Sequence, residues 1–307
     1  MFRSSHKYRI RPVLCFCFLV PFIAATSVGS SPLQAQPVFE DALGRKITVA
    51  KPPLRIVSLA PNITEILYAL DIGNRIVGVT IYSDYPDEAK QKPKVGSYVN
   101  LSIEKIVSLK PDLIIGTYGG NPKTTVLRLG ELGFPVYVTR TETAAEMLTM
   151  IENIGTITYT SEKAGVLANT LRQRISAVTS KVRNARHPLV FLEINARPLI
   201  TTGAGSFQHE VITLAGGRNL AADSPSRYPQ YSLEDVVEKG PDVILISTMD
   251  RAGLFEQQKA QWMRWETIPA VQNNRIYVID SDLVDRASPR VVDGLEEMAR
   301  LIHPTLF

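Results

Sequence analysis

Two glutamates occupy the same place in a unit that the chain carries twice. The unit reads SIEKIVSLKPDLIIG over residues 102–116 and SLEDVVEKGPDVILI over residues 232–246, with Glu104 and Glu234 in third position. An exposed carboxylate can pair with an arginine of a partner protein. It can equally favour the N-terminus of its own helix through the helix dipole, without any function. The pattern taken alone favours this structural role.

Other residue types that carry chemistry are scattered. After residue 35 the histidines are His187, His209 and His303, with neither H-x-H nor H-E-x-x-H spacing, so no metal site is expected. The segment TTGAGSFQ (201–208) is expected to be a turn entering a helix, because it matches neither a nucleophile elbow nor a phosphate loop. No nucleophile has a base at recognisable spacing. We therefore expect neither catalytic residues nor a cofactor.

Tyrosines gather where loops leave the predicted strands. TIYSDYPDEA (80–89) supplies Tyr82 and Tyr85, Tyr98 comes just before the first repeated unit, and Tyr228 and Tyr231 come just before the second. Loops at the carboxyl ends of parallel strands form the crevice of open α/β sheets. Aromatic faces there suit a large, flat, partly apolar ligand, although each tyrosine could also serve only in packing. The matching placement of Tyr98 and Tyr228 leaves both interpretations open.

The first 35 residues have the order of a secretory signal peptide. A basic segment precedes the apolar run VLCFCFLVPFIAA and the small, polar TSVGSSPLQA. About 13 apolar residues are fewer than the ~20 that a spanning helix needs, so cleavage after Ala35 and a periplasmic location are expected. The leader holds Cys15 and Cys17, the only cysteines, and four of the 34 basic residues. The mature chain then carries 30 basic and 30 acidic residues, which does not indicate a nucleic-acid partner.

The elements that must position these residues alternate between strand and helix. Short β-branched runs at 55–60, 75–80, 112–117 and 135–140 are separated by helical patterns, which predicts a parallel sheet. One of these predicted helices ends at Gly73, and another begins with Ser102 as its N-cap. Residues 142–184 contain no convincing strand, and a long helix is predicted from Ser161. A second alternation follows, with strands at 189–194, 242–247 and 275–280 and a closing helix at 288–303.

This pattern predicts an α/β protein with two similar lobes, mainly parallel sheets, joined by one long rigid helix. The expected divisions are a signal peptide (1–35), an N-terminal lobe (36–140), a connecting helical segment (141–187) and a C-terminal lobe (188–307). A cleft between two lobes is a common place for a small ligand. The repeated glutamates would occupy equivalent places on the two lobes, which suits docking on a twofold partner.

Five segments carry a family resemblance over nearly the whole mature chain. They are RIVSLAPNITEIL (55–67), VGVTIYSDYP (77–86), LSIEKIVSLKPDLIIG (101–116), YPQYSLEDV (228–236) and DSDLVDRASPR (280–290). These segments resemble the periplasmic cobalamin (vitamin B12)-binding proteins of ABC importers. That family belongs to the class III substrate-binding proteins, whose two lobes sit on a rigid helix and which also serve haem and iron-siderophores. The resemblance implies a monomeric binding protein that is not an enzyme.

The resemblance also implies roles for particular residues. Tyr82 would contact the corrin ring, and Tyr98 and Tyr228 stand where the family has stacking tryptophans. Glu104 and Glu234 match glutamates that engage arginines of the permease dimer, which works with ATPase subunits; with the resemblance, we favour this docking role over the helix-dipole role. The residues matching the second lobe's side of the cleft are Asp282, Leu283, Val284, Asp285 and Arg286.

Two departures from the family pattern leave the ligand open. Both stacking tryptophans are tyrosines here, and a cysteine pair of the second lobe is missing. A tyrosine still stacks, but it offers less area than tryptophan. Cobalamin is the expected ligand, although the sequence does not separate it from another corrinoid such as cobinamide. Haem or a ferric siderophore is the alternative ligand. An exported enzyme on the same fold is the third and most distant alternative.

Overall fold

A computed structural model of the chain describes residues 1–3, 5–7, 37–247 and 255–307. The chain divides into two compact units, 1–35 and 36–307, and the fold below is that of the second unit. Cys15, Cys17 and the expected cleavage point after Ala35 lie outside the described residues. Within the described part of the chain, no helix is both long and apolar enough to cross a membrane.

The first lobe is built on a four-stranded parallel sheet. Its order is β4 (Ile76–Gly78), β3 (Ile56–Ser58), β5 (Leu113–Thr117) and β6 (Val136–Thr139). Helices α1 (Pro61–Ala69), α2 (Asp87–Lys90), α3 (Ile103–Ser108) and α4 (Lys123–Glu131) alternate with these strands, and a 3-10 turn η1 (Gly73–Arg75) precedes β4. The strands are β-branched runs because helices cover both faces of a parallel sheet. The expected first alternation is confirmed.

The second lobe repeats this plan. Its parallel sheet has the order β10 (Arg218–Asn219), β7 (Leu189–Glu193), β11 (Val243–Ile246) and β12 (Ile276–Val278). The helices are α7 (Phe207–Leu214), α8 (Leu233–Lys239), α9 (Phe255–Trp262), α10 (Pro269–Gln272), α11 (Ser281–Val284) and α12 (Val291–Ile302). Two small antiparallel pairs complete the described strands: β1 (Val38–Glu40) with β2 (Lys46–Thr48), and β8 (Asn195–Ala196) with β9 (Leu199–Ile200).

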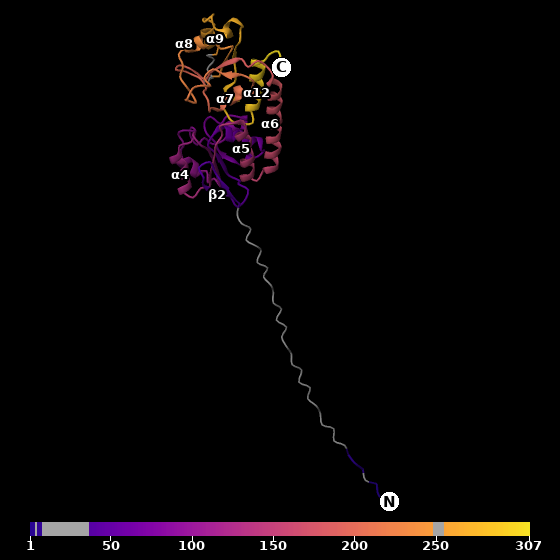
Figure 1. The fold of residues 1–307 in the computed structure, drawn as a ribbon. Helices are drawn as coiled ribbons and strands as arrows, with labels where there is room; N and C mark the ends of the chain where they lie inside the picture. The colour runs from indigo at the N-terminus through magenta and orange to yellow at the C-terminus, as the bar shows by residue number, and fades with distance from the viewer. Residues whose placement is uncertain (4, 8–36, 248–254) are drawn as a thin grey trace. The chain divides into compact units, whose positions relative to one another are not determined.

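Two helices, rather than one, connect the sheets. The predicted long helix is α6 (Ser161–Val182), and it packs against α5 (Ala144–Ile157), as Figure 1 shows. Only residues 158–160 join them, which makes an antiparallel pair. Another difference lies in α1, which ends at Ala69 although its pattern predicted a helix reaching Gly73. There the chain tightens into η1 before entering β4.

Both copies of the repeated unit form a capped helix followed by a strand. Ser102 accepts a hydrogen bond from the backbone N–H of Lys105 at the start of α3, and Ser232 accepts one from Asp235 at the start of α8. In α8 the Asp235 side chain in turn accepts a hydrogen bond from the backbone N–H of Ser232, which completes a capping box. The N-cap predicted at Ser102 is confirmed, and the capping acid is the residue after Glu234 rather than Glu234 itself.

The apolar core continues from one lobe into the other. One cluster joins Ile56 and Leu113 of the first sheet to Val190 and Leu245 of the second through buried residues of α5, α6 and α12. Separate clusters cover the opposite face of each sheet. A continuous core of this kind resists separation of the lobes, because opening it would expose apolar area at about 25 cal/mol per Å².

Candidate functional site

The tyrosines predicted to face a ligand are exposed in loops beyond the parallel strands. The exposed fraction is 56% for Tyr82, 37% for Tyr98 and 50% for Tyr228. Tyr82 follows β4 and Tyr228 follows β10, and these strands belong to different lobes. Exposed aromatic rings in such loops can offer their faces to a flat ligand, so these rings are candidates for ligand contact.

Tyr98 is held in place through its backbone. The buried side chain of Asn121 donates to the carbonyl oxygens of Tyr98 (2.8 Å) and Leu59 (2.9 Å) and accepts from the N–H of Thr117 (2.8 Å). The Tyr98 ring lies against Gly120, where an added Cβ would stand 2.3 Å from a ring carbon. The loop after β5 therefore leaves the space that this ring needs.

Tyr228 is held through its hydroxyl by a chain of polar side chains. The hydroxyl donates to Gln208 Oε1 (3.4 Å), and Gln208 Nε2 donates to Asp285 Oδ1 (3.0 Å). Ser247 Oγ donates to the other oxygen of this carboxyl (3.3 Å). Burial, only partly offset by these two bonds, raises the pKa of Asp285 to about 6.

The hydroxyl of Tyr228, in the second lobe, is influenced by residues of both lobes. Burial of its hydroxyl is the main cause that raises the pKa of Tyr228, and the negative charges of Asp285 and Tyr98 add to it.

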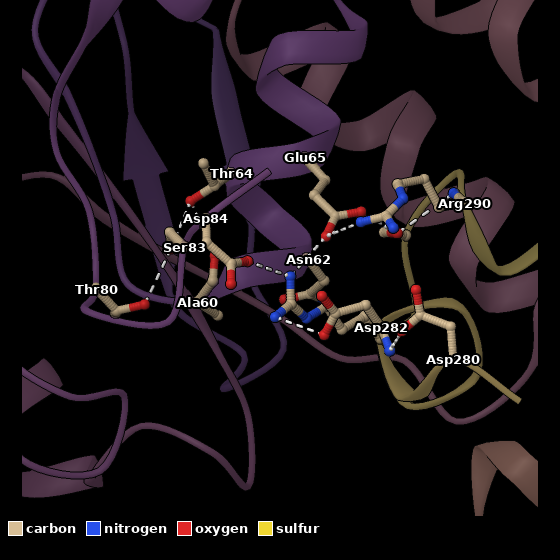
Figure 2. A network of polar contacts seen from close by, with 12 residues as sticks. Ala60, Asn62, Thr64, Glu65, Thr80, Ser83, Asp84, Asp280, Asp282 and Arg290 are labelled. Carbon is tan, nitrogen blue, oxygen red and sulfur yellow. Dashed lines mark hydrogen bonds and ion pairs between the residues drawn. The ribbon is translucent and has the colours of Figure 1, made fainter. Parts of the chain in front are cut away.

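The predicted segment 282–286 faces the first lobe more than open space. Val284 is fully buried in the core. Arg286 donates to Glu65 Oε1 (3.0 Å) and Asp84 Oδ1 (2.9 Å) of the first lobe, and its other terminal nitrogen pairs with Asp282 (2.8 Å). The Arg286 guanidinium is therefore occupied by carboxylates of the protein itself, as Figure 2 shows for its surroundings.

Glu65 is the centre of these contacts between lobes. Its side chain is 2% exposed, and it accepts from Ser288 Oγ (2.6 Å) and Arg286 while pairing with Arg290 (3.5 Å). Burial raises the pKa of Glu65 against the lowering effect of these partners. We call the following residues the interlobe cluster: Glu65, Asp84, Asp282, Arg286, Ser288 and Arg290.

The YSDYP loop delivers Asp84 to this cluster. Buried Ser83 accepts from Thr64 Oγ1 (3.0 Å) and shares a hydrogen bond with Thr80 (3.0 Å), which fixes the loop against α1 (Figure 2). Beyond Asp84, the ring of Tyr85 lies 3.9 Å from the guanidinium carbon of Arg290. This motif of the sequence thus connects the two lobes as well as presenting Tyr82.

A second ionic contact joins the lobes beside Tyr228. Glu142, which follows β6, accepts from Arg140 (2.9 Å) and from Arg227 of the second lobe (2.6 Å). The two arginines hold the pKa of Glu142 below its usual value. Arg140 also lies over the ring of Tyr118, 5.4 Å from its centre. Sequence reasoning missed Glu65, Gln208, Glu142 and Arg227. Glu65, Gln208 and Arg227 lie inside or beside segments quoted above, whereas Glu142 lies in none of them.

The repeated glutamates are on the surface, away from these buried contacts. Glu104 and Glu234 are both exposed in the first turns of α3 and α8. Glu104 accepts from Ser102 Oγ (3.0 Å), and its own backbone N–H together with this hydroxyl lowers its pKa. In the part of the chain that the structure describes, no three His, Cys, Asp or Glu residues gather to hold a metal ion.

Comparisons with known proteins agree with this architecture. A family model described as periplasmic binding protein matches residues 56–283. The vitamin B12-binding protein of Vibrio cholerae is 36% identical over 248 residues, which cover 80% of this chain and 88% of that protein. An uncharacterized ABC transporter substrate-binding lipoprotein of Bacillus subtilis is 33% identical over 87% of this chain and 86% of that protein.

Solved structures give the same result. The crystal structure of the periplasmic vitamin B12-binding protein of Vibrio cholerae superposes with a TM-score of 0.73 at 35% identity, covering 82% of this chain and 98% of that one. A periplasmic haem-binding protein from Roseiflexus sp. superposes with a TM-score of 0.73 at 26% identity, covering 82% and 99%. The predicted class of two-lobed binding proteins is confirmed, and the chain belongs to the periplasmic binding protein family.

Proposed function

We propose that this protein binds a corrinoid, with cobalamin as the first candidate, between its two lobes and delivers it to an ABC importer in the periplasm. The observation that carries the proposal is that both lobes present exposed tyrosines in loops that follow the strands: Tyr82 and Tyr98 on the first lobe and Tyr228 on the second. Aromatic faces on both sides suit a flat macrocycle. The similarity to vitamin B12-binding proteins supports the same ligand class.

The polar chemistry of the site also suits a ligand that brings its own metal coordination. The arginines and acids between the lobes are paired with one another, as in Arg286 with Glu65 and Arg227 with Glu142. A corrin ring supplies its own four nitrogen ligands to cobalt, so the protein needs only stacking faces and hydrogen bonds. We propose Asp282, Leu283, Val284, Asp285 and Arg286 as the second lobe's side of the site, with Asp285 and Arg286 acting through their neighbours.

Haem is the second candidate, because structural relatives at 25–26% identity bind it. Haem iron in proteins takes an axial ligand such as histidine, cysteine, methionine or tyrosine. The Tyr228 hydroxyl already donates to Gln208, whereas Tyr82 and Tyr98 are also exposed and could serve as such a ligand. The higher identity to vitamin B12-binding proteins is what favours the corrinoid.

Isothermal titration of the mature protein with cyanocobalamin, haemin and a ferric hydroxamate tests the proposal. We expect saturable binding of one cyanocobalamin per monomer and far weaker binding of the other two. Tight, saturable haemin or hydroxamate binding with none of cyanocobalamin would refute the ligand. Turnover of the bound compound would refute a pure binding role.

We further propose that Glu104 and Glu234 dock the protein on the permease dimer and that residues 1–35 direct export. Both glutamates are exposed at matched places on the two lobes, which suits a partner with twofold symmetry. Mass spectrometry of the periplasmic protein should give a chain that begins at Gln36.

A further inference from the structure

The interlobe cluster divides its charges unevenly between the lobes. The first lobe supplies two acids, Glu65 and Asp84, whereas the second supplies both arginines, Arg286 and Arg290, and the acid Asp282. Glu65 is the most buried of these acids. Its carboxylate accepts hydrogen bonds from Ser288 and Arg286 and forms an ion pair with Arg290. Because hydrogen bonds are directional, three donors converging on two oxygens allow little variation in the placement of one lobe against the other.

We propose that Glu65 is a positioning residue that fixes the alignment of the two lobes and thereby the spacing of the tyrosines on either side of the ligand. The continuous apolar core near α5, α6 and α12 limits separation of the lobes but is not directional. The hydrogen bonds to the Glu65 carboxylate are directional, so they constrain the orientation of one lobe against the other. Asn62 adds a weaker contact of the same kind from α1, donating to the carbonyl of Ala287 (3.4 Å).

The alignment can be measured without any ligand. The chain has no cysteine after residue 35, so cysteines placed at Ser108 and Glu238 carry two spin labels without background. Both positions are exposed and occupy equivalent places in the repeated units on α3 and α8. The distance distribution between the labels, measured by pulsed electron resonance, therefore reports how one lobe is placed against the other.

The variants are Glu65→Gln, Glu65→Leu and the milder Ser288→Ala. We expect the distance distribution to broaden or shift in all three, most in Glu65→Leu and least in Ser288→Ala. The matched control is Glu152→Gln, which removes a carboxylate from an exposed ion pair with Arg172 (3.2 Å) between α5 and α6 and should leave the distribution unchanged. A role limited to stabilising α1 would lower the melting temperature but leave the distance as it is.

The consequence for binding rests on the proposed function. If the aligned fraction of Glu65→Gln molecules falls to about one fifth, the dissociation constant for cyanocobalamin should rise about fivefold. An unchanged distance distribution in folded Glu65→Gln and Ser288→Ala overturns the proposal. A changed distribution with unchanged affinity overturns the link to ligand spacing. Absence of cyanocobalamin binding in the wild type would instead refute the proposed ligand, and the distance measurement would still decide the role of Glu65.

Discussion

At the scale of single residues, a chain of polar side chains that ends at Asp285 holds one exposed tyrosine in place. Tyr228 shows half of its surface to water, but its hydroxyl is tied through Gln208 to a carboxyl of the second lobe, Asp285. The role of Gln208 is not visible in the sequence, because Gln208 lies 77 residues from Asp285 and the segment TTGAGSFQ that ends with it indicates only a turn entering a helix. The presence of Tyr228 could be predicted; its support could not.

The raised pKa of Asp285 gives a pH-dependent prediction. A carboxyl whose folded pKa is about 6, above its unfolded value of 3.8, stabilises the fold at low pH, and this contribution is lost as the pH rises through 6. The substitution Asp285→Asn should therefore raise the free energy of unfolding at pH 7.5 by about 2 kcal/mol relative to its effect at pH 4. Urea denaturation at both pH values measures this, and a difference of opposite sign would contradict it.

Two substitutions of Tyr228 test the contribution of its ring separately from that of its hydroxyl. Replacement by phenylalanine keeps the face and loses one long hydrogen bond, so affinity for cyanocobalamin should fall less than about threefold. Replacement by alanine removes the face and should weaken binding at least about tenfold, since an aromatic contact contributes about 0.5–1.5 kcal/mol beyond its buried area. Titration calorimetry compares the two. Equal losses for both would show that the hydroxyl, not the face, meets the ligand.

At the scale of elements, the repeated unit could be predicted well because its signals are local. The Ser102 cap, the helical spacing and the following β-branched run all lie within one stretch of chain, and the structure confirms each of them. The early end of α1 and the α5–α6 pair were harder to predict from the sequence. Their limits depend on tertiary packing: α5 and α6 pack on each other, and an added Cβ at Gly73 would stand 2.3 Å from the Tyr68 ring.

The glutamates of α3 and α8 allow a test of docking against helix stabilisation. Exposed charges at an interface act mainly on association and contribute little to stability. Replacing Glu104 and Glu234 together by alanine should leave cyanocobalamin affinity and melting temperature nearly unchanged. It should sharply lower ligand-stimulated transport in vesicles that contain the importer, with partial effects of each single change. Lower stability with normal transport per folded molecule would show that both residues act through the helix dipole instead.

At the scale of the whole molecule, contacts between lobes join residues that are far apart in sequence. Glu65 and Ser288 are 223 positions apart, so no local pattern could reveal that they meet. The two-lobe plan followed from the alternation of strands and helices, whereas the interlobe cluster required the structure. The continuous core and the cluster together oppose hinge motion.

Limited motion is itself testable by small-angle scattering. Because the lobes share an apolar core and the buried Glu65–Arg286 pair, the radius of gyration should stay the same within error when cyanocobalamin is added. The mature protein is measured with and without ligand at matched concentration. A clear compaction would show that the lobes close by a hinge.

The central claim is that a corrinoid occupies the space between the lobes, and a direct competition tests it. Apo protein is mixed with one equivalent each of cyanocobalamin and haemin, freed of unbound ligand by gel filtration, and its absorption spectrum is recorded. The account predicts the corrin spectrum at one equivalent per chain. A protein fraction that carries the haem spectrum and no corrin would contradict it.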